Sequence, residues 1–461
     1  MDVEVIEIPV LSPDEIEVEV RRAIEEENLN SVRDLLNNQY AADIADVLER
    51  LDDDRRYDVF QTLAADLASE VLDEAGQHTT NLLLTRLPVD RVVSLLNRMP
   101  MDDLVEIMAD DIPERQDEIL SEMHPQTALE IREQLEYLPE SAGRIMTRKY
   151  VRINEDMTAA EVLAHMRRVD SRVETVTNAY VLDPAQRLIG VISLRETINV
   201  PAQRQVKDYM ETQVVSVTPD KDQEEAARML ARYDFLALPV VTEDDRMLGI
   251  ITVDDAIDVL AQENTEDIMR FGAVSGEAND QPYFTVPILR VIQGRFVWLL
   301  LLFFADLITS NVLRFYDTQL ATVVTLSFYI PLLIGTGGNT GAQTVSMIIR
   351  GMAVGDIRGK DVLRVMRREL FSGLILGTML GMFAFWRVYL IDGERNMIPV
   401  VIGLSILAIS AWSNMIASVI PMVTKRLGID PAVISAPLIS TLVDATGLFI
   451  YLNIAIAVLN I

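Results

Sequence analysis

The chain contains no cysteine, and its only three histidines are His78, His124 and His165, scattered along 461 residues. The absence of cysteine excludes disulfide bonds, thiolate metal sites and cysteine nucleophiles. The shortage of histidine argues against a zinc site, because zinc in proteins is held mainly by cysteine and histidine. Without thiols or clustered imidazoles, softer transition-metal ions gain little here.

Basic residues are also scarce. Lysine and arginine number 40 against 70 aspartates and glutamates, so the formal net charge is −30, although 50% of the residues are hydrophobic. The acids crowd into residues 1–285, and apolar runs fill the remainder. An acidic soluble half argues against nucleic acid as a partner and favours cations. The alternative reading is that the excess of acid only keeps the protein soluble.

The N-terminus, MDVEVIEIPV, lacks a basic region followed by an apolar run. We therefore expect no cleaved signal peptide and a cytosolic location for the acidic half. A chain of 461 residues corresponds to about three domains, so several structural units are expected.

Apolar runs long enough to cross a bilayer recur from about residue 295 onward. A spanning helix needs about 20 predominantly apolar residues. The alternative, that these runs are buried helices of a large soluble protein, is much less favoured. The five predicted spans are roughly 295–315, 319–337, 368–391, 397–423 and 432–460.

Basic residues between the spans predict their orientation. Lys425 and Arg426 follow the fourth span, and the loop between the second and third spans carries Arg350, Arg358, Lys360, Arg364, Arg367 and Arg368. The positive-inside rule makes both loops cytosolic. The chain is then a multi-pass protein of the cell (inner) membrane, with its N-terminal half in the cytosol and its C-terminus outside.

An internal repeat precedes the membrane part. VLDPAQRLIGVISLRET (181–197) aligns with VVTEDDRMLGIITVDDA (240–256) at a constant offset. Upstream of each copy, a strand, a turn and an amphipathic helix also repeat. This duplicated β-α-β-β-α layout over residues 146–262 resembles a tandem pair of CBS domains, which implies a ligand-sensing module, often for adenine nucleotides, rather than a catalytic one.

Residues 1–145 contain no comparable strands. Short amphipathic stretches such as AADIADVLERL and VDRVVSLLNRMP follow one another, each stopped by proline or an acidic turn. This pattern predicts a superhelical stack of short helices.

An acidic helix is expected between the repeat and the first span, at DDAIDVLAQENTEDIMRFG (254–272). Glu263, Glu266 and Asp267 share one face of it at i, i+3 and i+4. Like charges so placed destabilise a helix unless something neutralises them. The alternative is a solvated acidic surface.

One carboxylate, Asp444, lies in the last apolar run, within STLVDATG. A charge in a span costs about 2.5 to 3.5 kcal/mol on insertion scales, so it usually lines an aqueous path or has a partner. Ser440, Thr441 and Gly447 lie on the same helix face. This small, polar stripe predicts a pore wall or a close helix contact. The alternative is an aspartate that caps a broken helix or bonds a neighbouring serine.

The second predicted span ends in a glycine-rich run, YIPLLIGTGGNTGAQ (329–343). It lacks the lysine and serine or threonine of a phosphate-binding loop. We expect its glycines to allow a helix break or a close backbone approach that frees carbonyls toward a cavity. Asn339 and Gln343 add polar groups to this stretch, as Ser410, Ser413, Asn414 and Ser418 do in the fourth span.

Three stretches together resemble the MgtE family of magnesium channels and transporters over nearly the whole chain. They are IPLLIGTGGNTGAQ, DPAVISAPLISTLVDATGLFIYL and, after the two CBS repeats, VDDAIDVLAQENTEDI. The resemblance implies a multi-domain membrane protein with an all-α superhelical N-terminal domain, an α/β tandem CBS pair, an acidic connecting (plug) helix and a five-helix transmembrane domain. The corresponding segments are 1–145, 146–200 with 201–262, 254–285 and 286–461.

The resemblance also implies a homodimer around one central pore, with Asp444 as the central Mg²⁺-binding residue. Mg²⁺ gives up its water reluctantly, so two facing carboxylates can hold the hydrated ion. Ala436 stands where the family has a polar asparagine. Asp306, in the first span, matches no family site and is either a pore vestibule residue or a partner of Ser310.

In the cytosolic half the resemblance implies a Mg²⁺ sensor, with ATP as a further ligand of the CBS pair. Its implied metal ligands are Glu70, Asp102, Glu106, Glu224, Asp234, Asp255, Asp258, Glu263, Glu266, Asp267 and, at the mouth of the last span, Asp430. Two unit charges about 5 Å apart repel by roughly 3 kcal/mol at an effective dielectric constant of about 20. Bound Mg²⁺ would remove this repulsion and close the pore, and falling Mg²⁺ would open it.

The sequence therefore predicts a Mg²⁺-selective channel or transporter for magnesium uptake that is closed by cytosolic Mg²⁺. One alternative is a broader divalent-cation transporter for Co²⁺, Ni²⁺, Zn²⁺ or Mn²⁺. Another is a membrane-anchored CBS nucleotide sensor that transports nothing. An enzyme is not expected, because no nucleophile with a plausible base and no phosphate loop is found.

Overall fold

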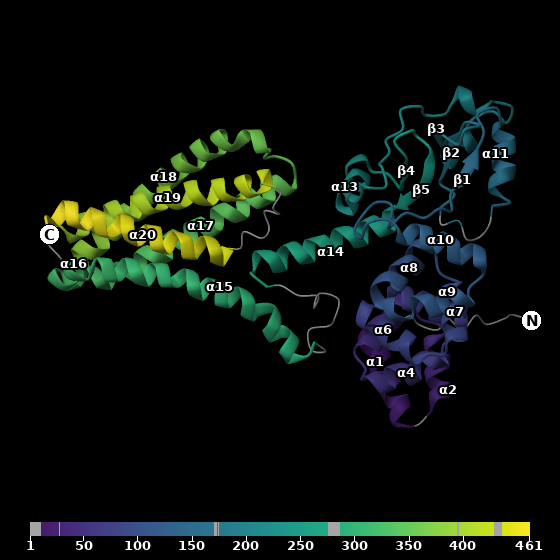
Figure 1. The fold of residues 1–461 in the computed structure, drawn as a ribbon, viewed down its shortest axis with the longest axis horizontal. Coiled ribbons are helices and arrows are strands. Elements are labelled where there is room, and N and C mark those ends of the chain that lie inside the picture. The colour runs from purple at the N-terminus through teal and green to yellow at the C-terminus, as the bar shows by residue number, and fades with distance from the viewer. Residues whose placement is uncertain are drawn as a thin grey trace, which may run out of the picture. The chain divides into compact units, whose positions relative to one another are not determined.

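The computed structural model describes residues 11–26, 28–169, 173, 175–274, 286–393, 396–427 and 436–461. The chain divides into two compact units (Figure 1). The first comprises Met1–Glu263 with Asp280–Val286, and the second comprises Asn264–Asn279 with Pro287–Ile461. Asp430, an expected metal ligand, and residues 275–285 of the expected connecting helix lie outside the described residues.

Short helices build the N-terminal part of the first unit. Polar side chains begin several of them: Ser12 donates from its backbone N–H and its hydroxyl to Glu15 at 3.0 and 2.8 Å, and Asp52 accepts from the Arg55 N–H. The helices are α1 (Pro13–Glu25), α2 (Leu29–Leu36), α3 (Ala41–Glu49), α4 (Asp53–Thr62), α5 (Ala65–Glu74), α6 (Gln77–Arg86), α7 (Val89–Leu96), α8 (Met101–Glu106), α9 (Gln116–Glu122) and α10 (Pro125–Leu135), with a π-helical turn η1 (Ile107–Asp111) and a 3₁₀ turn η2 (Pro113–Arg115) before α9.

These helices pack in two interleaved rows. In one row α1 contacts α3, α3 contacts α5, α5 contacts α7 and α7 contacts α9, and in the other α2 contacts α4 and α4 contacts α6. One hydrophobic core extends through the rows from Ile16 to Ile131. The predicted superhelical stack of short helices is confirmed.

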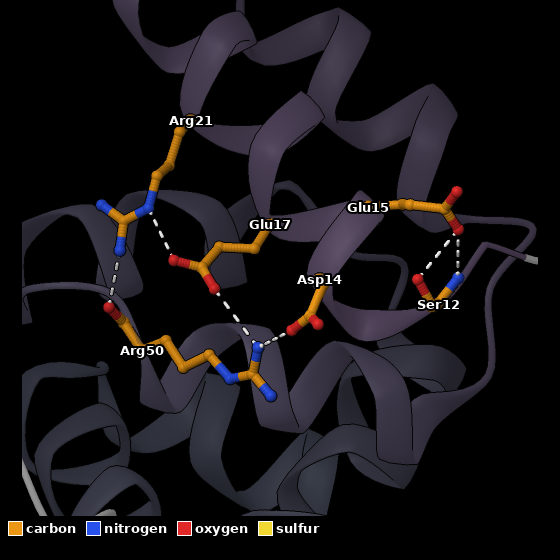
Figure 2. A network of polar contacts seen from close by, with 6 residues as sticks. All are labelled: Ser12, Asp14, Glu15, Glu17, Arg21 and Arg50. Carbon is orange, nitrogen blue, oxygen red and sulfur yellow. Dashed lines mark hydrogen bonds and ion pairs between the residues drawn. The ribbon is translucent and has the colours of Figure 1, made fainter.

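A polar network ties α1 to the end of α3 (Figure 2). The Arg50 guanidinium donates to Asp14 at 2.6 Å and to Glu17 at 3.3 Å. Arg21 in turn donates to the Arg50 carbonyl at 2.8 Å. Exposed ion pairs of this kind contribute about 0 to 1 kcal/mol each. The network therefore positions the first helix, and apolar burial supplies most of its stability.

A second arginine, Arg56 on α4, is buried against the end of α3 with 2% of its surface exposed. Its Nε donates to the Leu48 carbonyl at 2.8 Å, and a terminal nitrogen donates to the carbonyls of Leu51 and Glu49 at 3.0 and 3.3 Å. Carbonyls at the end of a helix have no partner within the helix. Arg56 supplies these partners.

Substituting Arg56→Leu is expected to destabilise the N-terminal helices by about 2 to 4 kcal/mol, because buried carbonyls lose their donors. Thermal unfolding of the full-length protein measures the effect. The neighbouring Arg55→Leu is the control: Arg55 forms only a surface pair with Asp52 at 3.4 Å, and its loss should change stability by less than about 0.5 kcal/mol. Equal losses in the two variants would contradict the assigned role of Arg56.

Helix α10 joins the helical part to the strands that follow. Gln134 on α10 is fully buried, and its amide donates to the carbonyls of Met146 and Arg144 at 2.6 and 3.1 Å. Tyr137 packs against the hydrophobic cluster that contains Ala142 and Met146. The helical stack is thereby anchored to the core of the strand-containing part.

The strand-containing part holds two small sheets. In the first, β1 (Val151–Ile153) pairs parallel with β2 (Asn178–Leu182), which pairs antiparallel with β3 (Leu188–Ser193). In the second, β4 (Ala237–Val241) pairs antiparallel with β5 (Met247–Thr252). The accompanying helices are α11 (Ala159–Met166), α12 (Leu194–Asn199), the 3₁₀ turn η3 (Val206–Asp208), α13 (Gln223–Tyr233) and α14 (Val253–Phe271).

The two hairpins have the same register. Val181 lies opposite Gly190 in the first, and Val240 lies opposite Gly249 in the second. The pairing register shifts directly after both valines. The internal repeat predicted from the sequence is therefore present in the backbone.

The start of each copy pairs with the hairpin of the other copy. Glu211, at the start of the second copy, exchanges backbone hydrogen bonds of 2.9 Å with Val191 of the first. Thr147, at the start of the first copy, does the same with Ile250 of the second, at 2.8 and 2.9 Å. A Cβ on Gly249 would lie 2.5 Å from the Thr147 carbonyl oxygen, so glycine is required there. The exchanged segments make the pair one structural module.

The second unit consists of long helices. They are α15 (Ile288–Phe315), α17 (Ile330–Ala353), α18 (Val362–Leu390), α19 (Ile398–Arg426) and α20 (Ala436–Leu459), joined in part by α16 (Asp317–Thr322), η5 (Val324–Tyr329) and η6 (Gly359–Asp361). Within the described residues, four helical stretches are long and apolar enough to cross a membrane: Ile288–Phe315, Gly359–Leu390, Ile398–Arg426 and Ala436–Leu459. The protein is a multi-pass membrane protein.

The second predicted span is placed differently. Residues 319–337 do not form one helix, because α16 and the 3₁₀ segment η5 precede α17, which begins at Ile330 with Pro331 in its first turn. Proline fits the first turn of a helix and so marks its start. The residues on both sides of this break are apolar, so the hydrophobic pattern of the sequence did not indicate it. Helix α17 packs on α19 and α20.

Glycines bring α18 and α19 into backbone contact. A Cβ on Gly373 or on Gly377 would lie 2.8 Å from backbone atoms of α19, and one on Gly381 would lie 2.5 Å from the Gly403 carbonyl. Spaced four residues apart, these glycines line one face of α18, as is typical of close helix pairs in membranes. The sequence analysis did not identify this contact.

The substitution Gly377→Ala is expected to destabilise the second unit by about 1 to 3 kcal/mol, because the new methyl group meets backbone rather than a movable side chain. Gly335→Ala on α17 is the matched control, since a Cβ there has no atom within 4 Å. Alanine should stabilise that helix by about 0.5 to 1 kcal/mol. Thermal unfolding of the detergent-solubilised protein distinguishes the two, and a stable Gly377→Ala variant would contradict the tight packing.

Candidate cation sites

The Asp444 carboxylate faces the glycine run of α17. A Cβ on Gly338 would clash with the Ser440 hydroxyl and lie 3.6 Å from Asp444 Oδ1. Oδ1 is buried, and among the described residues it has no hydrogen-bond partner. A buried carboxylate oxygen without a donor is costly. This oxygen is therefore open to a proton or a cation, and no described serine bonds it.

Of the two alternatives expected for the α17 glycines, a helix break or a close backbone approach, the structure shows the close approach. Helix α17 is continuous from Ile330 to Ala353. A Cβ on Gly337 would lie 2.9 Å from Val443, and one on Gly341 would lie 3.1 Å from Ile439. Without side chains at these positions, α17 packs closely against α20 on the side that carries Ile439 and Val443.

The predicted polar stripe of α20 divides between two neighbours. Ser440 and Asp444 lie toward Gly338, whereas a Cβ on Gly447 would contact Ile409 of α19 at 3.5 Å. Thr441 is half-buried and donates to the Pro437 carbonyl at 3.1 Å. Gly447 therefore serves helix packing, and Ser440 is the neighbour that shares the surroundings of Asp444.

The polar edge of the fourth predicted span lies inside the unit. Ser413 is buried and donates to the Gly337 carbonyl at 2.7 Å. Asn414 is buried, accepts from Thr344 at 3.0 Å and donates to the Glu369 carbonyl at 3.3 Å. These groups bond α17, α18 and α19 to one another. By contrast, Asn339 and Gln343 of α17 are exposed on this protomer.

A second set of carboxylates lies in the first unit, and we name it the acidic cluster: Asp73 on α5, Asp103 and Glu106 on α8, and Asp255 at the start of α14. The Asp73 and Asp103 side chains interact closely and repel each other when both are charged, so a proton or a cation is favoured beside them. Asp255 repels both, while Thr252 donates to it from its hydroxyl at 2.5 Å. Acids from three helices therefore meet here.

Proton affinity in the acidic cluster is raised. Desolvation, followed by repulsion from Asp103, raises the pKa of Glu106 to about 7. Desolvation is likewise the largest cause of the raised pKa values of Asp73, Asp103 and Asp255. Asp258, one turn after Asp255, also has a raised pKa through desolvation and repulsion from Asp254. These surroundings disfavour negative charge, so the cluster favours binding of protons or cations, which neutralise the carboxylates.

Only part of the sequence-predicted set joins this cluster. Of the predicted ligands, Glu106 and Asp255 belong to the cluster. Asp258 interacts electrostatically with Glu106. Asp102, adjacent to Asp103, is buried with 6% of its surface exposed. Glu70 is exposed on α5, one turn before Asp73.

The other predicted ligands lie along α13 and α14. Glu224 is ion-paired with Arg228 on α13. Asp234 is exposed and ends that helix in the left-handed conformation, at φ 53°. Glu263 accepts from Gln223 at 3.4 Å. Farther along α14, Glu266 is ion-paired with Arg270, and Asp267 is half-buried.

Asp73 and Asp103 were not predicted from the sequence. Both belong to short acidic helices whose contact faces follow from the superhelical packing. The pair Asp102–Asp103 was the available signal, but two adjacent residues on a helix point in different directions. Across the described ranges, no group of three or more histidine, aspartate or glutamate side chains is arranged to hold a bare metal ion.

Comparison with known proteins agrees with these observations. Residues 330–454 match the family described as MgtE, divalent cation transporter, and residues 39–140 match the MgtE intracellular N domain. Residues 142–202 and 206–262 each match the CBS domain. The CBS pair predicted from the repeat is confirmed.

Curated relatives match most of the chain. The magnesium transporter MgtE of Thermus thermophilus is 37% identical over 453 residues, which cover 96% of this chain and 98% of the relative. The magnesium transporter MgtE of Bacillus subtilis is 33% identical, covering 74% of each chain. The protein of the same name from Enterococcus faecalis is 34% identical, covering 71% of each chain.

A solved structure resembles the first half. It is the crystal structure of the cytosolic domain of the Mg²⁺ channel MgtE in complex with ATP, which is 34% identical with a TM-score of 0.51 and covers 53% of this chain and 99% of that one. The family models thus match the helical stack, the CBS pair and the long apolar helices in turn. The chain belongs to the MgtE family of divalent cation transporters.

Proposed function

We propose that this protein is a Mg²⁺-selective channel or transporter for magnesium uptake, closed by cytosolic Mg²⁺. The observation that carries the proposal is the Asp444 carboxylate, whose Oδ1 is buried without a donor among the described residues and faces the glycine run of α17. The curated relatives named magnesium transporter support the choice of ion. No thiol is available to favour softer ions.

Asp444 is proposed as the central residue of the pathway. Mg²⁺ keeps several of its waters when it binds proteins, and one or two carboxylates commonly hold it. In a homodimer, which we also propose, two copies of Asp444 would flank the path and hold the hydrated ion together. Asn339 and Gln343, exposed on this protomer, would line the same path.

The acidic cytosolic residues are proposed as the Mg²⁺ sensor. They comprise the acidic cluster together with the ligands expected from the sequence, Glu70, Asp102, Glu224, Asp234, Asp258, Glu263, Glu266, Asp267 and Asp430. Mg²⁺ would neutralise them through its water shell and stabilise the closed state. Helix α14 begins in the first unit and ends in the second, so it is the proposed link to the pathway.

Three further properties complete the proposal. Because the basic loops follow the positive-inside rule, the N-terminal half is proposed to lie in the cytosol and the C-terminus outside. ATP is proposed as a ligand of the CBS pair, since the structural relative was crystallised with ATP. The protein is proposed to act by transport and binding, not as an enzyme, and without a nucleic-acid partner.

Uptake of Mg²⁺ by liposomes that contain the purified full-length protein tests the proposal. Liposomes with protein should accumulate Mg²⁺ well above protein-free liposomes. Equal inhibition of that uptake by Co²⁺ and Ni²⁺ would favour the broader divalent transporter. Absence of any cation uptake would favour the membrane-anchored nucleotide sensor and overturn the proposed function.

A further inference from the structure

A second carboxylate, Asp306, lies within a membrane span. It is on α15, where no other charged residue occurs between Arg295 and Arg314. Its side chain is exposed on the protomer, among the exposed apolar side chains of Phe303 and Leu307. A charge in a span rarely faces lipid, and it usually lines water or meets a partner. Apolar packing therefore does not explain why a charged residue stands at position 306.

Asp306 lies close enough to Asp444 for the two carboxylates to repel each other. The two acids lie on neighbouring helices, because α15 packs along α20. No hydrogen bond or ion pair joins Asp306 to another described residue, so the expected partner Ser310 does not bond it. Asp444 Oδ1 likewise lacks a donor within the described part of the chain. Two interacting acids on neighbouring helices favour a doubly charged cation, because it balances both charges at once.

We infer that Asp306 is a second carboxylate of the cation pathway, which acts with Asp444 to select divalent over monovalent cations. The inference rests on the proposed function, because it concerns the same pathway. Mg²⁺ retains its first water shell, so the pair needs no direct coordination geometry and can act on the hydrated ion. A monovalent cation leaves one of the two charges unbalanced and so gains less.

Two variants test the charge in liposomes that contain the full-length protein. Asp306→Asn should raise the Mg²⁺ concentration for half-maximal uptake about tenfold and lower the preference for Mg²⁺ over Na⁺ by a similar factor. Asp306→Glu should keep both within about threefold of wild type. Asp317→Asn, an exposed acid beyond the end of α15, is the control and should change neither. Wild-type values in Asp306→Asn would overturn the inference.

Accessibility supplies an independent test, because the chain has no cysteine. In Asp306→Cys, the single thiol should react with a water-soluble thiosulfonate, and Mg²⁺ should slow the reaction at least tenfold. Phe304→Cys is the control: Phe304 is 58% exposed and lies about half a helical turn away, so its thiol should react far more slowly. A thiol at 306 that reacts no faster than one at 304 would mean a lipid-facing position and overturn the inference.

Failure of the proposed function and failure of the inference give different uptake results. If the wild-type protein takes up no Mg²⁺, the proposed function fails and the inference fails with it. If wild type takes up Mg²⁺, Asp444→Asn abolishes uptake and Asp306→Asn leaves affinity and selectivity unchanged, only the inference fails.

Discussion

Substituting Asp444→Asn is expected to lower Mg²⁺ uptake into liposomes at least about 30-fold. A carboxylate that interacts directly or through water with a divalent ion contributes roughly 2 kcal/mol or more over a neutral amide, and 1.4 kcal/mol corresponds to a factor of ten. In a homodimer both copies change together, so the loss is larger still. Initial rates of uptake, with equal amounts of protein inserted, measure the effect.

Stability separates a functional from a structural loss. Asp444 Oδ1 is buried, and no described residue donates to it, so asparagine should leave the thermal unfolding temperature unchanged or higher. Residues retained for function commonly reduce stability. An Asp444→Asn variant that unfolds at a lower temperature would indicate a structural role. Unchanged uptake in a stably folded variant would contradict the pathway assignment.

Raising the pH is expected to destabilise the first unit when Mg²⁺ is absent. The pKa of Glu106 is raised from 4.5 to about 7, so the folded state binds a proton that the unfolded state has released. The stability from this group is fully present below about pH 4.5 and is lost as the pH rises through about 7. The raised pKa values of Asp73, Asp103 and Asp255 act in the same direction.

Calorimetry of the full-length protein measures this dependence. Without Mg²⁺, the unfolding temperature of the first unit should fall by roughly 5 °C between pH 5.5 and pH 8, and millimolar Mg²⁺ should reverse the fall at pH 8. The double variant Asp103→Asn with Glu106→Gln should flatten both responses. Asp90→Asn, which removes an exposed acid from α7, is the control and should behave as wild type. A transition that rises with pH would contradict the account.

Local patterns predicted the architecture because the physics behind them is local. The repeat fixed the hairpin register, with Gly190 and Gly249 in equivalent positions. Prolines and acidic turns separated the short helices of the N-terminal stack. Asp444 stood out because a lone charge in an apolar run is costly wherever the helix packs.

The remaining features depend on packing between distant segments. The meeting of Asp73 and Asp103 requires the superhelical turn that brings α5 beside α8 and the start of α14. The glycine-rich sequence of α17 is equally compatible with a helix break and with a close approach of a neighbouring helix. The short distances from these glycines to Val443 and Ile439 of α20 show the close approach. Similarly, apolar continuity across 319–337 concealed the 3₁₀ segment before Ile330.

The central claim is that cytosolic Mg²⁺ closes a Mg²⁺ pathway through this protein. The most direct test measures initial Mg²⁺ flux through wild-type protein in liposomes while Mg²⁺ on the side of the cytosolic half is raised from micromolar to about 10 mM. The account predicts that flux falls steeply over this range and that the double variant Asp103→Asn with Glu106→Gln responds more weakly. A flux that is independent of Mg²⁺ on that side, or that rises with it, would contradict the account.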